Sequence, residues 1–506
     1  MQLAGKGADS RTGNDALAGK YDAIAYATQS NPLSHPDQMA VVATLFGLEP
    51  APAATCRVLE FGCNNGANLL PLAAGLPDAD FVGCDLSPTA IAAARAAADE
   101  LGLANVKLFE GDLSALPESL GDFDYMIAHG VYSWVPAPVR DAMLALAGRR
   151  LRPNGVLLVS YNVYPGGHVR RAVWEALHFS VDRIEDTRAR LAAARALAAA
   201  LAEPGPTQYP TDAFLREEFR RVAQSPDSAL YHDDLAEPNE PVYFHQFAAH
   251  AARHGLRFVA EADLPLNAPR LSPQLQNLVV GRARLEQEQL VDFAQLRRFR
   301  QSLLCRAGSE AEFTLAPERL ASMHLGTSPM LRHAAANGKA LVNPDAAATP
   351  AAAEARLLRA LCDLLLSIAP ETLPVSAVGA RLHWPPPAGA RRSLEALLAE
   401  ACLHGLLTPS LHPGAAVARA GDRPTASAYA RWQSKRGIEV TNLRHETMPL
   451  REVSALRLLA LLDGTRTRAD LAAELAYVLP GWAPPVIAQR VEECLAQFGK
   501  LALLVS

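Results

Sequence analysis

The sequence predicts an α/β fold in its first half, a mostly parallel sheet covered by helices, followed by helix-rich domains. Short apolar segments with the length of buried strands alternate with longer helical segments between residues 57 and 161. Acidic residues stand at the ends of the first two of these strands and just after the third. Because parallel strands need crossover connections, this alternation indicates βαβ units, whose ligands bind at the carboxyl ends of the strands.

Five strands are expected in this part of the chain. They are the segments 57–61, 80–85, 105–109, 123–128 and 156–161. Helices are expected over 67–74 and over the alanine-rich segment 88–101, where Ser87 is placed to cap the N-terminus. The chain of 506 residues is long enough for two to four domains.

The loop after the first strand distinguishes between three kinds of ligand. Residues 58–70 read VLEFGCNNGANLL, without the Lys and Ser/Thr of a phosphate loop. A dinucleotide loop would carry glycine where Asn64 stands, and the carboxylate of Glu60 would repel a pyrophosphate. A carboxylate at this place suits a cation without phosphate, such as S-adenosylmethionine (SAM), which has an ammonium and a sulfonium group.

Acidic residues near the ends of the next two strands fit the same ligand. Asp85 is suited to accept hydrogen bonds from both ribose hydroxyls, and Asp112 from the adenine amino group. The alternative is an α/β domain whose strand-end acids are only solvated. Three such acids at the expected spacing favour SAM, and Asn64 can adopt the positive φ that its glycine position requires.

On the basis of these motifs, residues 21–170 of the chain resemble class I SAM-dependent methyltransferases. More narrowly, the chain resembles bacterial, rickettsial-type methyltransferases with a methyltransferase regulatory domain, some of which are protein-lysine methyltransferases acting on outer-membrane proteins. The narrower resemblance covers most of the first 310 residues and rests on YDAIAY (21–26), SHPDQMAVVATLFGL (34–48), FDYMIAHGVYSWVP (123–136), SYNVYPG (160–166), 231–261 and DFAQLRRFRQSLLC (292–305). It implies a Rossmann-like seven-stranded sheet. The pattern of 169–306 predicts a helical insertion before the last two strands, and three short helices with a closing strand over 448–506 indicate α-rich, winged-helix-like C-terminal domains.

The resemblance implies SAM as the cofactor and S-adenosyl-L-homocysteine as its product. The residues expected to bind the cofactor are Tyr21, Tyr26, Glu60, Gly62, Cys63, Asn64, Gly66, Asn68, Asp85, Leu86, Gly111, Asp112, Leu113 and His129. Tyr21 and Tyr26 lie on a segment that resembles a lid over the cofactor.

Three further residues, Tyr132, Trp134 and Asn162, are expected along the substrate channel. Burial against aromatic walls, together with the positive sulfonium, would lower the pKa of a lysine amine and so expose its lone pair. Trp134 could instead be a core residue, and His129 could cap a turn. No metal site is expected, because the histidines considered, at 35, 129 and 168, lack ligand spacing.

The resemblance and the composition together divide the chain into six parts. These are an N-terminal helical lid segment (1–50), a SAM-binding Rossmann-like core (51–168), a helical insertion or regulatory region that completes the sheet with strands near 255–261 and 298–306 (169–308), a middle helical or winged-helix-like domain (309–410), a linker (411–437) and a C-terminal winged-helix-like domain (438–506).

Charge and cysteine content exclude several classes of protein. The formal net charge of −5, and the balance of seven basic and seven acidic residues after position 440, argue against nucleic-acid binding. The seven cysteines form no CxxC pair, which argues against a zinc or disulfide framework. No apolar leader is found at the N-terminus, and no aliphatic run is long enough for stable membrane insertion, so a cytoplasmic protein is expected.

Three functions remain open. The first is N-methylation of lysine side chains in a protein substrate by in-line methyl transfer, by a chain that could form a homo-oligomer. The second is N- or O-methylation of a small molecule. The third is a SAM-binding, non-catalytic interaction protein, for which Asn64 in the glycine position is the hint.

Overall fold

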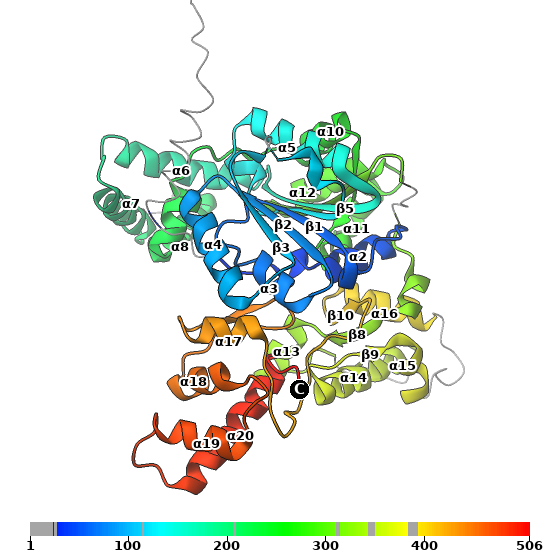
Figure 1. Cartoon of the computed structure of the whole chain (residues 1–506). Helices are drawn as coiled ribbons and strands as arrows, with labels where there is room; N and C mark the ends of the chain where they lie inside the picture. Colours follow the sequence, from blue (N-terminus) through cyan, green and yellow to red (C-terminus); the bar gives the residue numbers. More distant parts are fainter. Residues whose placement is uncertain are drawn as a thin grey trace, which may run out of the picture.

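The computed structural model describes residue 24 and residues 28–113, 116–205, 209–309, 314–342, 350–382 and 393–506. Tyr21 and Tyr26, both expected at the cofactor, lie outside the described residues. In Figure 1 the sheet and its helices form the upper part of the molecule, and two smaller domains lie side by side beneath it.

A seven-stranded sheet organises the first 306 residues, in the order β3-β2-β1-β4-β5-β7-β6. Its strands are β1 (Arg57–Phe61), β2 (Asp80–Asp85), β3 (Val106–Glu110), β4 (Phe123–Ala128), β5 (Leu151–Asn162), β6 (Leu256–Glu261) and β7 (Phe299–Arg306). The first five are parallel to one another, and β7 is antiparallel to both β5 and β6. The predicted Rossmann-like seven-stranded sheet is therefore confirmed, with both late strands. The strand expected over 156–161 is longer in the structure, because β5 already begins at Leu151.

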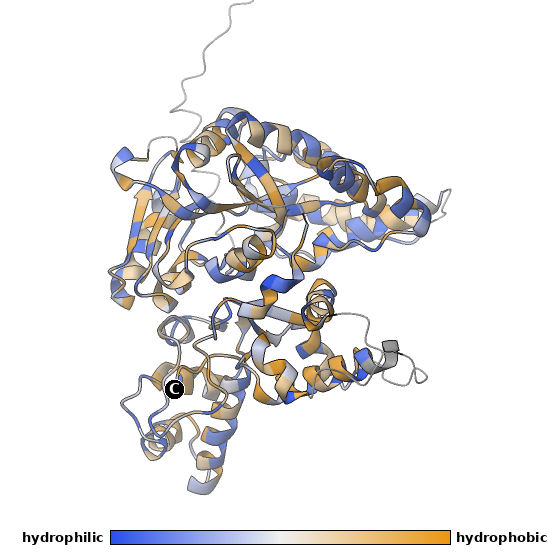
Figure 2. Ribbon diagram, turned by 90° about the vertical axis from the view of Figure 1, so that its right-hand side faces the viewer, coloured by the Kyte–Doolittle hydropathy of each residue, from blue (hydrophilic) through white to orange (hydrophobic). Residues whose placement is uncertain are grey.

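Alternate residues of each central strand face two separate cores. Val58 and Ile127 belong to the core beneath α2 (Pro36–Leu45) and α3 (Leu69–Gly75). Leu59 belongs to the opposite core, beneath α5 (Ala137–Arg150) and α10 (Phe244–Arg253). Because successive side chains of a strand point to opposite faces, strands buried on both sides are mostly apolar, with Glu60 of β1 an exception. Figure 2 shows this in the sheet, whereas the surrounding helices mix hydrophobic and hydrophilic residues.

A helical insertion separates β5 from β6. It contains α6 (Gly167–Val181), α7 (Thr187–Ala202) and α8 (Pro210–Gln224), which pack around their own apolar cluster and project from one side of the molecule (Figure 1). The short segments α9 (Asp227–Ala229) and η6 (Leu230–Asp234) return the chain towards the sheet before α10 begins. The insertion therefore adds a lobe whose last turn reaches the carboxyl ends of the strands.

Two small domains follow the sheet. The middle one combines a three-stranded sheet, β8 (His324–Thr327), β9 (Leu373–Pro374) and β10 (Leu407–Ser410), with α13 (Pro329–Ala336), α14 (Pro350–Ile368), α15 (Val375–Arg381) and α16 (Leu394–Leu403). The last contains α17 (Ala428–Ser434), the hairpin β11 (Glu439–Thr441) and β12 (Thr447–Pro449), and α18 (Val453–Leu461), α19 (Arg468–Ala476) and α20 (Pro484–Lys500). The predicted domain boundaries stay predictions; α17 lies within the segment expected as a linker. No helix among the described parts of the chain is long and apolar enough to cross a membrane.

One buried arginine joins β7 to its surroundings. The Arg300 guanidinium is fully buried, donates to both carboxylate oxygens of Asp292 at 2.9 and 2.8 Å, and donates to Glu261 Oε1 at 2.6 Å. Its third acidic partner is Glu288 at 3.1 Å, and it stacks on the ring of Phe244. Bidentate pairing at full burial satisfies charges that would otherwise be costly to remove from water.

We expect replacement of this arginine to destabilise the sheet strongly. Arg300→Met leaves the buried carboxylate of Glu261 without its ion-pair partner and leaves Asp292 with only Arg297, at 3.3 Å. Breaking a buried pair costs about 3–5 kcal/mol. Arg306→Met, on the exposed end of the same strand, should change the unfolding free energy by less than about 0.5 kcal/mol. Urea unfolding of both variants measures the difference, and equal losses would contradict the role given to Arg300.

Candidate functional site

A cavity of about 470 Å³ opens at the carboxyl ends of β1, β2 and β4. Most of the residues expected to bind the cofactor line it, namely Glu60, Gly62, Cys63, Asn64, Asn68, Asp85, Leu86, Gly111, Asp112, Leu113 and His129. Gly66 does not line it. The loops after β1, β2 and β3 therefore bring together the three acids that the sequence singled out, Glu60, Asp85 and Asp112.

The loop after β1 is held against the end of β2 by backbone bonds. The amides of Gly62 and Cys63 both donate to the carbonyl oxygen of Cys84, at 2.8 and 3.1 Å. Gly62 has φ +66°, and a Cβ at this position would lie 2.8 Å from a methyl group of Val131. Asn64 has φ 47°, so this asparagine does adopt the left-handed conformation that its position requires.

The Asp85 carboxylate is fixed at the tip of β2. Its Oδ2 accepts from the Asn64 amide at 2.9 Å, and its Oδ1 accepts from the Ser87 amide at 2.9 Å. Ser87 caps α4 (Pro88–Leu101), as predicted, by accepting from the Ala90 amide. Since a carboxylate oxygen can accept more than one hydrogen bond, Asp85 can also accept from a ligand's hydroxyls.

Glu60 is a buried carboxyl with one oxygen left unsatisfied. Its side chain lies at the cavity, and the residue is only 4% exposed. Oε1 accepts from Asn68 Nδ2 at 2.8 Å, while Oε2 has no hydrogen-bond partner among the described residues. Burial raises the pKa of Glu60 to about 8 in spite of the hydrogen bond from Asn68, which lowers it, and the charge of Asp85 adds a smaller upward shift to that total. A buried polar atom without a partner calls for one, and a cationic ligand would supply it.

Asn68 joins three distant segments at the wall of the cavity. Its Oδ1 accepts from the Asn31 amide at 2.8 Å, from Ser34 Oγ at 3.1 Å, and from His445 Nε2 at 2.8 Å. His445 comes from the turn between β11 and β12 in the C-terminal domain, 377 residues away. Burial lowers the pKa of His445 well below its usual value, so the ring is neutral and donates from Nε2.

A second polar chain crosses the cavity beside Asn68. Asn31 Nδ2 donates to Gln301 Oε1 at 2.8 Å and lies 3.3 Å from His129 Nδ1, which acts as the acceptor. Burial lowers the pKa of His129 to about 4, so this histidine is neutral at pH 7 and carries its proton on Nε2. Gln301 belongs to β7, and no local sequence pattern distinguishes it.

The predicted substrate-channel residues separate in the structure. Trp134 lines the cavity together with Val135 and Val139. Tyr132 and Asn162 do not line it. Tyr132 is 2% exposed because its ring packs between other core aromatics and its hydroxyl bonds His250 Nδ1 at 2.9 Å. Asn162 donates from its side chain to Asn239 Oδ1 at 3.0 Å.

Residues that sequence reasoning missed come from outside the first βαβ units. Thr28 to Pro32, His232, Asp233 and Gln301 all line the cavity. The Nε2 atom of His232 lies 2.7 Å from the carbonyl oxygen of Ile24, so the end of the insertion contacts the N-terminal segment. Only the folded chain brings these residues to the strand ends.

Three sequence families match the chain. Residues 58–155 match a methyltransferase domain, residues 226–306 a predicted methyltransferase regulatory domain, and residues 422–478 the PKMT C-terminal winged helix domain. The last match begins inside the segment expected as a linker.

Relatives and solved structures agree with these matches. RP028, an uncharacterized protein of Rickettsia prowazekii, is 34% identical over 236 residues, 46% of this chain and 94% of that protein. RP789 of the same organism is 33% identical over 58% of this chain, but the match spans only 54% of that longer protein. The structure of PKMT2 from Rickettsia typhi covers 95% of this chain and 100% of its own, with a TM-score of 0.78 and 25% identity. The same protein in complex with AdoHcy gives a TM-score of 0.80 at 24% identity.

The strand order, the acids around one cavity, and the matches to both flanking modules lead to one family. The chain belongs to the class I SAM-dependent methyltransferases that carry a methyltransferase regulatory domain and a winged-helix C-terminal domain of the PKMT type.

Proposed function

We propose that the chain binds SAM in the cavity at the ends of β1, β2 and β4 and methylates lysine side chains of a protein substrate. The observation that carries the proposal is the buried Oε2 of Glu60, which has no hydrogen-bond partner among the described residues. Glu60 lines the same cavity as two other acids, Asp85 and Asp112. The match to the winged-helix domain of PKMT, a protein lysine methyltransferase, supports the choice of acceptor, and the AdoHcy complex of PKMT2 from Rickettsia typhi supports the choice of cofactor.

The residues present fit this cofactor. Glu60 would take its cationic end, Asp85 its ribose hydroxyls, and Asp112 its adenine amino group. When bound, SAM would supply a methyl group on a positive sulfur: an amine lone pair would attack the methyl carbon in line with the C–S bond, and S-adenosyl-L-homocysteine would leave. The loop at Gly62 would bring the backbone close to the ligand. Its conformation is held by the hydrogen bonds that its amides donate to Cys84 and Asp85.

The apolar wall of the same cavity favours an amine acceptor. Trp134, Val135 and Val139 would cover the aliphatic part of a lysine side chain and exclude water from its amino group. Removing an ammonium from water lowers its pKa and raises the fraction with a free lone pair. Holding that lone pair in line with the methyl group contributes the larger part of the rate, because orientation alone can supply roughly 7–11 kcal/mol at the extreme.

Several expectations accompany this proposal. The resemblance supports a protein substrate, and the charge balance supports the absence of nucleic-acid binding. A cytoplasmic location stays a proposal. We also keep self-association into a homo-oligomer as a proposal. The small-molecule methyltransferase and the non-catalytic SAM-binding protein remain the alternatives that the experiment below separates.

The proposed function predicts labelled methyl-lysine in a protein. The purified chain is incubated with SAM that carries an isotopically labelled methyl group and with an undialysed bacterial extract, and both peptides and small molecules are analysed by mass spectrometry. Asp85→Ala should lower the yield at subsaturating SAM roughly ten- to a hundredfold, because hydrogen bonds to a charged group contribute about 1.5–3 kcal/mol. Asp80→Ala, at the opposite and exposed end of the same strand, should retain activity. Label found only on small amines would favour the small-molecule alternative, and label on nothing would favour the non-catalytic one.

The bond from His445 predicts that the C-terminal domain contributes to cofactor affinity. His445→Ala removes one of three donors to Asn68 and loosens the residue that holds Glu60, so SAM should bind roughly tenfold more weakly, the effect of about 1.4 kcal/mol. Glu439→Ala, exposed on β11 of the same hairpin, is the control. Calorimetric titration of both variants with SAM gives the comparison, and equal affinities would refute the coupling.

A further inference from the structure

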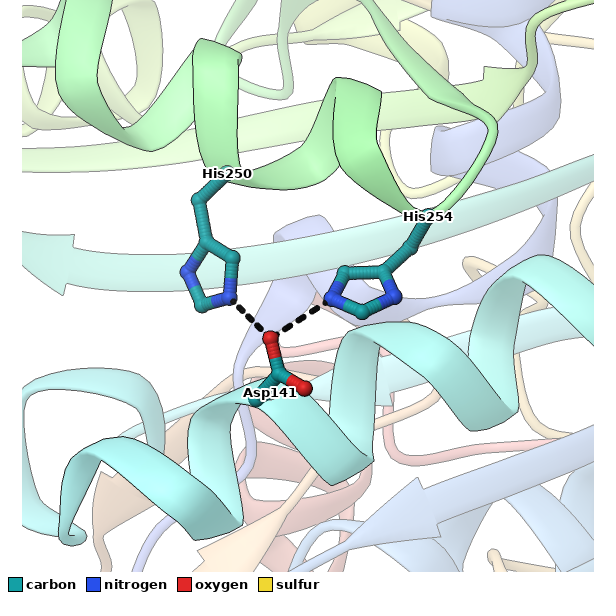
Figure 3. A group of neighbouring side chains, drawn as sticks. All are labelled: Asp141, His250 and His254. Carbon is teal, nitrogen blue, oxygen red and sulfur yellow. Dashed lines mark hydrogen bonds and ion pairs between the residues drawn. The ribbon is translucent and has the colours of Figure 1, made fainter.

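Two histidines and one aspartate meet between two helices, away from the cavity. His250 lies on α10, His254 caps the C-terminal end of the same helix, and Asp141 lies on α5. Both Nε2 atoms approach the same carboxylate oxygen, Asp141 Oδ1, at 3.2 and 2.8 Å (Figure 3). The histidines are four residues apart, so they lie on one face of the helix. None of the three lines the cavity.

We propose that Asp141, His250 and His254 bind a divalent transition-metal ion, with Zn²⁺ the best match to these ligands, and that the ion links α5 to α10.

The distances between the donor atoms suit such an ion. Zinc takes nitrogen and carboxylate oxygen at about 2.0–2.2 Å, so the ligand atoms of a tetrahedral site lie about 3.4 Å from one another. In the cluster the three ligand atoms lie within 4.8 Å of one another. A shift of the exposed Asp141 side chain by a few tenths of an ångström would open the space needed. Three protein ligands leave a fourth position for water, on the side where Asp141 is exposed.

The second nitrogen of His250 is already oriented by a buried group. His250 Nδ1 lies 2.9 Å from the hydroxyl oxygen of Tyr132. The ring of Tyr132 is held by Tyr161 and Phe247, so this hydroxyl is fixed. A histidine that binds metal through one nitrogen commonly donates from the other to such an acceptor, which sets its tautomer and ring orientation.

The side-chain types also suit coordination, since a carboxylate and two imidazoles are ligands that zinc accepts in proteins. Positive charge opposes the ion from two sides: Arg253 on α10, and Arg140, whose guanidinium lies over the ring of Tyr132. Arg140 is neutralised by its ion pair with Glu240.

An ion at this place would act on the structure rather than on the substrate. Its ligands join the first turns of α5, which carries Val139 of the cavity wall, to the end of α10. The sequence analysis expected no metal site because the histidines considered were those at 35, 129 and 168. In the sequence, His250 and His254 look like two residues of an ordinary helix. The third ligand, Asp141, lies 109 residues before His250.

The test uses the full chain, stripped with a chelator, and Zn²⁺ alone as the probe. Calorimetry should give one saturable site per chain, and thermal unfolding should shift upward with Zn²⁺ because the ion binds only the folded state. His254→Ala and Asp141→Asn should each bind Zn²⁺ at least tenfold more weakly, and the thermal shift at the same Zn²⁺ concentration should be smaller. Since Asp141 is exposed, Asp141→Asn keeps the fold even if His254→Ala does not.

A histidine elsewhere on the same helix provides the matched control. His245→Ala, at the other end of α10, should leave the Zn²⁺ affinity unchanged. The proposal is overturned if the chain shows no saturable Zn²⁺ binding, since the three side chains would then form a hydrogen-bonded cluster only. It is equally overturned if His254→Ala and Asp141→Asn bind Zn²⁺ as the unaltered chain does.

Discussion

The buried carboxyl of Glu60 is the constraint on which the site depends. Burial at the end of β1 leaves it a single bond, from Asn68, and raises its pKa to about 8. Taking such a group out of water is unfavourable unless a partner compensates it. The fold therefore holds, at the carboxyl end of β1, a group that is mostly neutral near pH 7 and that a cation bound beside it would ionise. That property explains why the cavity suits SAM better than a phosphate-bearing nucleotide.

Asn68 extends this constraint to the rest of the chain. Its carbonyl oxygen accepts hydrogen bonds from the segment before α2 and from the hairpin of the C-terminal domain, and its Nδ2 donates to Glu60 of the sheet. The same domain packs elsewhere on the sheet helices: Tyr429 is buried against Leu70 and Ala97, and Trp432 donates to Glu100 at 3.0 Å. The winged-helix module is thus part of the wall behind the cofactor cavity, which agrees with its balanced charge. A surface for nucleic acid would need an excess of cations.

Local pattern was enough to predict the sheet and the acids of the site. The strand lengths, the alternation with helices, and Glu60 and Asp85 at strand ends are properties of short segments, and the structure has them where the sequence indicated. The direction of Tyr132 was not predictable, because a single turn of 3-10 helix decides whether its ring faces the cavity or the core. His445 and Gln301 reach the site only by tertiary packing. Strands as short as β8 and β9 leave almost no periodic signal.

The central claim, that Glu60 receives the cation of SAM, has a direct measurement. SAM is titrated calorimetrically into the chain at pH 7 in two buffers with different ionisation enthalpies. With a pKa of about 8 in the free protein, Glu60 is mostly protonated at this pH, so binding should release close to one proton, and the release should fade above pH 8. Glu60→Gln should bind without this release. SAM binding that releases no proton at pH 7, or the same release from Glu60→Gln, would contradict the account.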